Sequence, residues 1–333
     1  MQQKTAAPIP RFALALIAGA CVLAGVTAQA ADAWPAKSIR LVVPYSPGNA
    51  GDVTFRLIQV ELEKRLGARF YIDNKSGASG NIGAEEVTRA APDGYTLLLG
   101  ATNNFVINQY LSKNLRYDPL KDLAPITKIN FAPSVVVVNS TFTAKTLPEL
   151  TAYAKSNPGK LNYGSPGNGT PPHLTGVLYG QLTQTELTHV PYRGSPPAVQ
   201  ALMANDVQIF FASAGLSTVA GQIAAGKLKA LAVAGEKRLE ALPDVPTTAE
   251  QGLPQLVTGN WWGLAAPVGT DPAILARIAA AVKESVADPA IAKQFSDLGL
   301  TAVGNSPAEF AAQNQKEAAV WKTTIEKSNI QIE

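Results

Sequence analysis

The feature that most constrains this fold is the alternation of short apolar runs with amphipathic helical patterns along the chain. Residues 39–43 (IRLVV) read as a buried strand, and a loop rich in proline and glycine separates them from a helical pattern over residues 52–66. That pattern repeats apolar side chains at spacings of three and four on one face: Phe55, Ile58, Leu62 and Leu66. Such a helix packs on a sheet, and strands that alternate with helices predict an α/β fold with a largely parallel sheet.

The same alternation continues towards the C-terminus. Further strands are predicted at residues 70–72, 95–99, 134–138, 161–163, 188–190, 207–211 and 228–233, and a helix at residues 84–91. Capping patterns mark where other helices begin, because a side-chain oxygen there bonds an amide that the helix leaves free. These patterns are Thr146 with Glu149, Asp271-Pro272, Asp288-Pro289 and Ser306-Pro307. The C-terminal part of the chain is therefore predicted to be helical.

Residues 1–30 have the layout of a secretory signal peptide. Lys4 and Arg11 supply positive charge, residues 12–26 are apolar or small, and residues 28–30 (AQA) form an A-x-A cleavage site. The apolar run is too short to span a bilayer, which takes about 20 apolar residues. We therefore predict cleavage after this site and a protein located in the periplasm. An uncleaved N-terminal anchor is the alternative.

Cys21 lies inside this leader and is the only cysteine, so the predicted mature chain contains none. A lipoprotein start at Cys21 fits poorly, because residues 18–20 (AGA) hardly match a lipobox. Without cysteine there is no disulfide, thiolate zinc site or cysteine nucleophile, and the fold must depend on its hydrophobic core. Loss of Lys4 and Arg11 lowers the 28 basic residues to 26, against 25 acidic ones. A net charge this close to zero argues against nucleic acid or an anionic membrane as a partner.

Patterns for catalysis and metal binding are sparse. The chain has two histidines, His173 and His189, which lie sixteen residues apart with a helix predicted between them. Neither a His-x-x-x-His spacing nor a G-x-S-x-G nucleophile motif occurs. We therefore predict no metal site, no cofactor and no enzymatic activity, and we interpret His189 as a structural residue of its strand. A Ser-Lys or Ser-His pair brought together by the fold stays open as an alternative.

Three glycine-rich loops precede predicted helices and present backbone amides. They cover residues 44–52 (PYSPGNAGD), 77–83 (GASGNIG) and 164–170 (GSPGNGT). Glycine lets a backbone approach a ligand closely, and a helix N-terminus offers unpaired N–H groups with a partial positive charge, which suits a carboxylate or a phosphate. The loops lack the nucleotide motifs G-x-G-x-x-G and Gly-Lys-Ser/Thr. Each loop alone fits an ordinary strand-to-helix turn, but the three together favour a binding cleft for an anion.

The length of the mature chain predicts two domains. No flexible linker separates them, so we expect the chain to cross between them at short rigid segments near residues 130–133 and 253–260. Predicted lobe 1 covers residues 31–131 and 259–333, and predicted lobe 2 covers residues 132–258.

Several long segments carry a family resemblance: residues 34–52 (WPAKSIRLVVPYSPGNAGD), 80–100 (GNIGAEEVTRAAPDGYTLLLG), 115–127 (LRYDPLKDLAPIT), 163–176 (YGSPGNGTPPHLTG), 188–208 (THVPYRGSPPAVQALMANDVQ) and 261–270 (WWGLAAPVGT). In this order, and over essentially the whole mature chain, they resemble the Bug family, the periplasmic solute receptors of tripartite tricarboxylate transporters. The resemblance implies a two-lobed periplasmic binding protein fold of type II, a Venus flytrap that closes over a small organic acid.

The resemblance also implies a function and a binding cleft. The function is that of an extracytoplasmic receptor which captures a mono- or dicarboxylate, aliphatic or aromatic, for the permease subunits of such a transporter. The alternatives are a receptor of the same fold that signals to a sensor kinase, and an exported enzyme that acts on a small acid. In the family, the ligand carboxylate is held largely by backbone amides and ordered waters. Carried over by position, the ligand-binding residues are Tyr45, Ser46, Pro47, Gly48, Asn49, Asp52, Thr102, Asn103, Asn104, Ser165, Gly167, Asn168, Gly169, Thr170, His173, Arg193, Ala212 and Ser213.

Three of these positions depart from the common pattern of the family. Relatives commonly have glycine where this chain has Asn49. They often have an aspartate, which can receive an ammonium group, where this chain has Ala212, so we expect no amino-acid ligand. Many have lysine where this chain has Arg193, which either grips a second carboxylate with two hydrogen bonds or pairs with an acidic residue. Aromatic residues near the cleft either line a ligand ring or belong to the core: Tyr45, Phe105, Tyr192 and Phe211.

Overall fold

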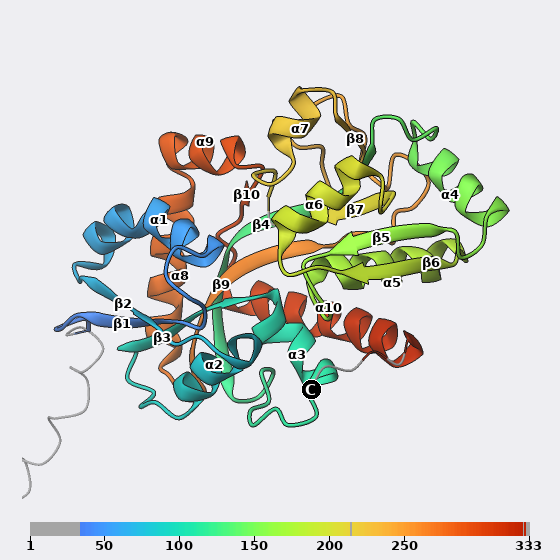
Figure 1. Ribbon diagram of the computed structural model, residues 1–333. Helices are drawn as coiled ribbons and strands as arrows, with labels where there is room; N and C mark the ends of the chain where they lie inside the picture. Colours follow the sequence, from blue (N-terminus) through green and yellow to red (C-terminus); the bar gives the residue numbers. More distant parts are fainter. Residues whose placement is uncertain (1–33, 214, 329, 331–333) are drawn as a thin grey trace, which may run out of the picture.

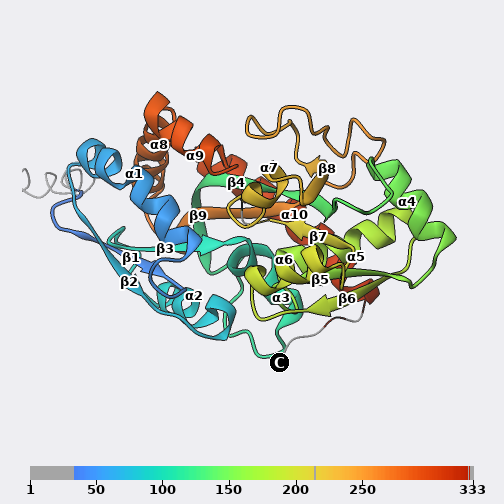
Figure 2. The same cartoon turned by 45° about the horizontal axis from the view of Figure 1, so that its top comes forward.

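The computed structural model describes residues 34–213, 215–328 and 330. The predicted leader and its cleavage site lie outside these residues. No helix in the part that the structure describes is long and apolar enough to cross a membrane. The described chain forms two lobes, each with helices packed on strands, which confirms the predicted two-lobed α/β fold (Figures 1 and 2).

The first lobe is built on a mixed sheet, so the prediction of a largely parallel sheet is wrong. Its strands are β1 (Ile39–Val43), β2 (Phe70–Asn74), β3 (Thr96–Ala101), β4 (Leu123–Asn139), β9 (Gly259–Pro267) and β10 (Thr301–Ala302). β1 lies between β2 and β3 and is parallel to both. β9 is antiparallel to β3 on one side and to β4 on the other, and β10 pairs with β4. β4 and β9 cross between the lobes and pair antiparallel with their neighbours. The parallel part of this sheet brings the carboxyl ends of β1 and β3 to one edge.

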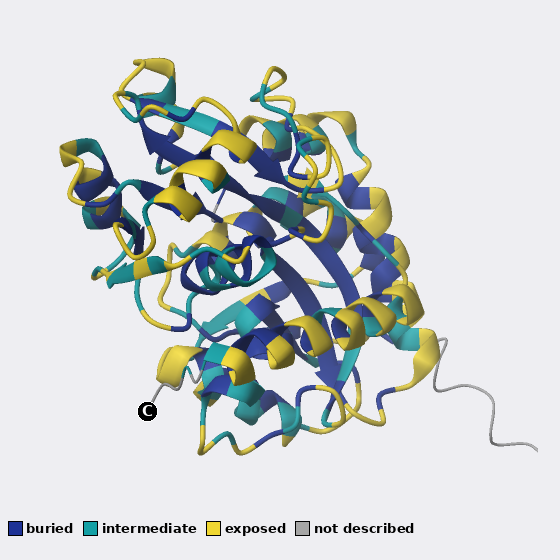
Figure 3. Ribbon diagram, turned by 90° about the vertical axis from the view of Figure 1, so that its right-hand side faces the viewer, coloured by how far each residue is buried: buried dark blue, intermediate teal, exposed yellow. Residues whose placement is uncertain are grey.

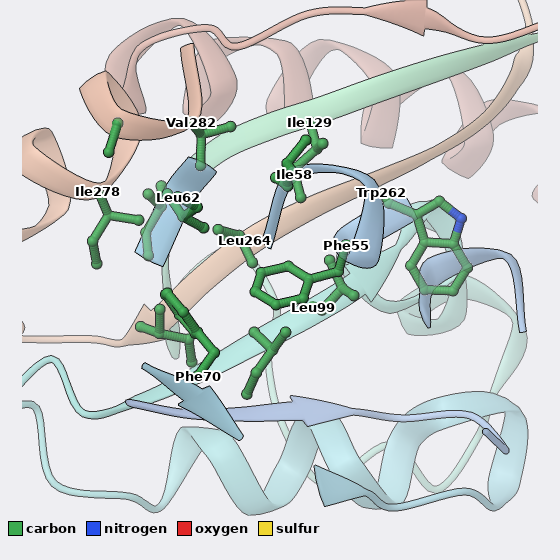
Figure 4. Packing of buried hydrophobic residues seen from close by; sticks show 14 of the residues in the cluster. Phe55, Ile58, Leu62, Phe70, Leu99, Ile129, Trp262, Leu264, Ile278 and Val282 are labelled. Carbon is green, nitrogen blue, oxygen red and sulfur yellow. The ribbon is translucent and has the colours of Figure 1, made fainter. Parts of the chain in front are cut away.

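Helices cover both faces of this sheet. They are α1 (Ala50–Leu66), α2 (Asn81–Thr88), α3 (Asn108–Leu111), α8 (Pro272–Val286), α9 (Pro289–Asp297) and α10 (Pro307–Ser328), with the short segments η1 (Ala78–Gly80) and η2 (Asn103–Ile107). On one face, Phe55, Ile58 and Leu62 of α1 share a buried cluster with Ile278 and Val282 of α8 (Figure 4). The predicted apolar face of α1 therefore packs on the sheet as expected. A second cluster, on the opposite face, contains Phe105, Trp261, Phe310 and Trp321.

The second lobe is built around the far end of β4. Its other strands are β5 (Leu161–Ser165), β6 (Leu187–Pro191), β7 (Ile209–Ala212) and β8 (Leu228–Ala234), and its helices are α4 (Leu147–Ser156), α5 (Pro171–Thr183), α6 (Ser195–Ala204) and α7 (Ala220–Ala224). β5 is parallel to β6 and β7, whereas β7 and β8 are antiparallel to β4. Buried residues follow β5, β7 and β8, whereas the edge strand β6 has none, and the helices expose their outer faces (Figure 3). A short loop connects the carboxyl end of β5 to the start of α5.

β4 is the main difference from the predicted elements. The sequence predicts a strand only over residues 134–138, but β4 begins at Leu123 and runs through both lobes. Its first part pairs with β9 as far as Pro133, and its last part, from Ser134, pairs with β8. Pro125 and Pro133 read as breaks in the sequence. Pro125 instead adjoins a register shift, where a strand tolerates a missing N–H, and the crossing near residues 130–133 is a continuous strand.

The predicted capping positions are confirmed. Thr146 Oγ1 accepts a hydrogen bond from Glu149 N (3.2 Å), and Ser306 Oγ accepts one from Glu309 N (3.3 Å). Asp271 and Asp288 cap α8 and α9 in the same way. Most other boundaries shift by one to three residues, because local sequence marks a helix or strand more clearly than its last turn.

Candidate functional site

The loop after β1 is tied to the loop after β3 by a tyrosine. The Tyr45 hydroxyl donates to Asn104 Oδ1 (3.1 Å), which also accepts a hydrogen bond from Ala101 N (3.0 Å). The Tyr45 ring meets Trp262 edge-on, with 5.4 Å between centroids. Burial raises the pKa of Tyr45 far above neutral pH, so its phenol stays a neutral donor. Asn104 is completely buried, and its Nδ2 has no hydrogen-bond partner among the described residues.

The amides at the start of α1 are largely occupied by the loop itself. Asn49 is the N-cap of α1: its Oδ1 accepts hydrogen bonds from Gly51 N (2.7 Å) and Asp52 N (3.3 Å). Gly48 N donates to Asp52 Oδ2 (3.0 Å). Gly51 also allows a close approach, since a Cβ there would lie 2.3 Å from the Trp262 ring. Asn49 therefore caps α1, and Ser46 and Pro47 are exposed at the tip of the loop.

The loop after β5 is also folded back on its own amides. Gly167 N donates to Ser165 Oγ (3.1 Å), and Gly169 N donates to His173 Nδ1 (3.0 Å). The Thr170 hydroxyl donates to the Gly167 carbonyl (2.7 Å). Asn168 is exposed at the tip. Fewer amides of this loop are free than the sequence suggested, because side chains of the loop and of α5 take several of them.

The loops of the two lobes meet at Asn103. Its Nδ2 donates to the carbonyl of Gly169 (3.3 Å) and to Asn108 Oδ1 (3.2 Å). Its neighbour Thr102 is fully buried, and the Thr102 hydroxyl accepts a hydrogen bond from Trp261 N (3.0 Å). The structure thus brings together segments after β3 and β5 that lie far apart in the sequence.

A small cavity opens beside this contact, and much of its lining is apolar: Pro166, Pro171, Pro172 and Phe210. Its volume is about 150 Å³, and its polar lining residues are Thr170, Ser195, Ser213, Thr218 and Asn260. The first residues of α5 and α6 lie at its wall, and neither helix has a side-chain cap. Both helix ends therefore direct a partial positive charge towards the cavity.

Prolines limit the amide donors at these two helix ends. Pro171 and Pro172 begin α5, and Pro196 and Pro197 follow Ser195 at the start of α6, so these residues have no N–H. Hydroxyl groups and the Asn260 amide must then supply much of the hydrogen bonding. The cavity offers donors without a charged side chain, which suits a small anion.

Of the eighteen assigned residues, only Thr170 and Ser213 line the cavity, and Arg193 and Ala212 are among the sixteen that do not. Arg193 is exposed in the turn before α6. Ala212 is 2 % exposed and belongs to a core cluster with Val135, Phe210 and Leu216, whereas the next residue, Ser213, lines the cavity. Ligand contact by Arg193 and Ala212 stays a prediction.

The aromatic residues divide between core and cleft. Phe105 and Phe211 are buried inside core clusters, and Tyr192 packs at the edge of another. Tyr45 alone of the four joins the network of cleft residues described above.

Seven residues of the cavity wall are not among the residues assigned from the sequence: the apolar Pro166, Pro171, Pro172 and Phe210, and the polar Ser195, Thr218 and Asn260. Ser195 opens α6 directly after a glycine, and Asn260 lies in the predicted crossing, so both had a local signal. No local sequence pattern marks Thr218, because only the folding of the segment after β7 brings it to the cavity wall. In the described part of the chain, no group of three His, Cys, Asp or Glu residues could hold a metal ion.

Comparison with known proteins adds independent information. Residues 54–330 match the family model described as "Tripartite tricarboxylate transporter family receptor". The Bordetella pertussis protein BugT is 31 % identical over 96 % of this chain and 98 % of its own length. A structure from R. palustris, solved with adipate, is 31 % identical with a TM-score of 0.74, over 90 % of this chain and 99 % of that one. MatC from Rhodopseudomonas palustris with bound malate is 32 % identical with a TM-score of 0.70, over 88 % of this chain and 100 % of that one.

Proposed function

Because this chain belongs to the tripartite tricarboxylate transporter receptor family and is a solute-binding receptor, we propose that it captures a small aliphatic mono- or dicarboxylate in the periplasm. The protein then delivers this acid to the permease subunits of a tripartite transporter. The similar structures that hold adipate and malate support a carboxylate as the ligand class. The layout of residues 1–30 supports export with removal of the leader.

The cavity at the ends of α5 and α6 carries this proposal, because a few polar groups stand there in a largely apolar lining. Hydroxyl donors and two uncapped helix N-termini converge there, and together they favour a group with negative charge. Its volume of about 150 Å³ is far below the range of about 300–1,000 Å³ typical of drug-sized ligands, so a small acid fits it better. We expect the assigned loop residues around Tyr45 and Asn103 to close the site from the first lobe.

The pairing of β4 and β9 supports a division into two lobes. We propose that residues 31–131 and 259–333 form one lobe and residues 132–258 the other. Two observations support this division: β4 exchanges β9 for β8 as its partner at Pro133 and Ser134, and β9 begins at Gly259.

Titration with adipate, malate and the diamide of adipate tests the anion site. We expect at least one of the two acids to bind and to stabilise the protein by about 2.7 kcal/mol at 100 times its Kd, as measured by thermal unfolding. The diamide should bind at least about tenfold more weakly, because hydrogen bonds to a charged group are stronger than those to a neutral one. Equal binding of adipate and its diamide would exclude a site selective for anions.

A pair of serine variants tests the location of the site. Ser213→Ala removes a hydroxyl from the cavity wall and should weaken acid binding about tenfold. Ser217→Ala is the matched control, because Ser217 is exposed in the same segment and does not line the cavity. Equal affinities of both variants and the wild type would place the ligand elsewhere.

A further inference from the structure

The two histidines of the chain form a stacked pair beneath the loop after β5. His173 belongs to the first turn of α5 and His189 to β6. Their ring centroids are 3.8 Å apart and their planes differ by 11°. Tyr163 of β5 flanks the pair, with its ring centroid 5.0 Å from that of His189. Sequence reasoning took His189 as structural and His173 as a ligand contact, whereas the structure places both in one unit.

This pair holds two backbone amides of the loop in place, those of Gly167 and Gly169. His173 Nδ1 accepts the hydrogen bond of Gly169 N, so in the neutral ring the proton resides on Nε2. His189 Nε2 lies 2.7 Å from Ser165 Oγ, which in turn accepts a hydrogen bond from Gly167 N. The amide positions of Gly167 and Gly169 thus depend on groups that belong to the pair or contact it.

The surroundings of the pair contain few groups that can hold charge. From β5, the rings face the phenol of Tyr163 and the hydroxyl of Ser165, and from α5 and β6 each histidine faces the other. Phe211 of β7 packs edge-on against the ring of Tyr163. Burial raises the pKa of Tyr163 well above neutral pH. No carboxylate from these elements contacts either ring. A positive charge on one ring would therefore meet only neutral groups and the neighbouring imidazole.

Protonation of His173 is incompatible with the observed loop. A proton on Nδ1 would direct an N–H group at the N–H group of Gly169, so their hydrogen bond would be lost. Burial lowers the pKa of His189 to about 4, and burial together with the charge of His189 lowers the pKa of His173 to about 4 as well. Above that range the pair is neutral and the loop keeps its shape.

We propose that His189 and His173 act as positioning residues for loop 165–170: the neutral stacked pair holds this loop in its ligand-binding shape, and proton uptake by His173 releases it together with the bound acid. The inference rests on the proposed carboxylate site, which this loop borders through Thr170. If so, the affinity of the receptor for the acid falls with decreasing pH more steeply than protonation of the ligand alone would cause.

The first test needs no ligand. The chain has two histidines, so selective ¹⁵N labelling gives two imidazoles, which single variants assign. We expect His173 to carry its proton on Nε2 at neutral pH and to titrate at least one unit below the value of about 6.5 for the free side chain. A His173 ring that titrates near 6.5, or that carries its proton on Nδ1 at neutral pH, would overturn the inference.

The second test separates positioning from simple packing. His173→Asn keeps an acceptor near the position of Nδ1 without a titrating proton, whereas His173→Phe keeps a flat ring and removes the acceptor. His189→Gln likewise keeps a hydrogen-bonding group for Ser165. Calorimetry with adipate and malate, at neutral pH and at about pH 4, where the pair takes up a proton, measures affinity for each protein. At a given pH the ligand is ionised to the same extent for every protein. Differences in affinity between the proteins therefore come from their imidazole groups.

The outcomes are distinct. We expect His173→Phe to lose at least about tenfold in affinity at neutral pH, His173→Asn to lose less, and both His173→Asn and His189→Gln to show a flatter decline in acid than the wild type. Equal losses for Asn and Phe, or the same pH dependence in all proteins, would contradict the inference. If neither acid binds the wild type, the proposed ligand class fails, while the ¹⁵N titration still decides the role of the pair.

Discussion

Ala212 decides whether the end of β7 faces the ligand or the core. Its methyl group packs with Val135, Phe210 and Leu216 and is 2 % exposed. We expect Ala212→Asp to lower the free energy of unfolding by on the order of 3 kcal/mol, because it buries a carboxylate without a partner. Urea unfolding measures this loss. Ser217→Asp, at an exposed position of the next segment, should change stability by no more than about 0.5 kcal/mol.

The opposite result would be equally informative. If Ala212→Asp unfolds at the same urea concentration as the wild type but no longer binds adipate or malate, Ala212 faces the cleft, as the family resemblance implies. The exclusion of amino acids as ligands would then gain support, because Ala212 offers no carboxylate to receive an ammonium group.

The histidine pair should make folding sensitive to acid. The folded-state pKa of each ring is lowered to about 4 from 6.5, so the unfolded chain takes up these protons first. Their contribution to stability is therefore complete above about pH 6.5 and is lost as the pH falls towards about 4. We expect the wild type to lose on the order of 2 kcal/mol over this window relative to His189→Gln, after allowance for solvent screening of the partly exposed ring. Urea unfolding at several pH values checks it, and parallel curves for the two proteins would contradict it.

The position of His173 could be predicted from the sequence, but its contacts could not. The segment 163–176 placed His173 beside the glycine-rich loop, and the structure has it there. Which ring nitrogen is used, and by which amide, depends on the turn of α5 and on contact with His189 from β6. Such a contact between a helix and a strand leaves no periodic trace in the sequence.

At the scale of elements, α1 depends on its cap. Asn49 Oδ1 holds two amides of the first turn, and its Nδ2 donates to the Ser46 carbonyl (2.6 Å). We expect Asn49→Ala to reduce the free energy of unfolding by about 1 kcal/mol, while Asn49→Gly costs only a few tenths. Urea unfolding of the two variants measures the difference. Equal losses would mean that the side chain does not cap the helix in solution.

Elements with a strong hydrophobic period could be predicted from the sequence, whereas the first part of β4 could not. Residues 39–43 and the apolar face of α1 follow simple periods, so their positions agree closely with the structure. The first part of β4 contains Pro125 and a buried Lys128, both of which argue against a central strand. A register shift at Pro125, and the rings of Phe131 and Trp261 beside the Lys128 amine, accommodate them only in the folded sheet. Tertiary context of this kind overrides local propensity.

At the scale of the whole molecule, the lobes are joined by two paired strands. β4 and β9 run side by side to the point where Pro133 faces Gly259. A Cβ at Gly259 would lie 2.2 Å from the carbonyl oxygen of Ala132, so the backbones approach there more closely than another residue allows. The sequence predicted both crossings from the absence of a linker, but their pairing with each other is a long-range contact that only the fold reveals.

This connection favours closure by bending near residues 132–134 and 258–260. The loops on either side of the cleft already touch through Asn103 and Gly169, and a bound acid that contacts both lobes would favour the closed arrangement. We expect small-angle scattering to give a smaller radius of gyration for the protein saturated with adipate or malate than for the free protein. Ser213→Ala at the same acid concentration is the control, because weaker binding should leave more of it open. A radius that stays constant at saturation would mean that the acid enters a rigid pocket, and the two strands would then act as a fixed support rather than a hinge.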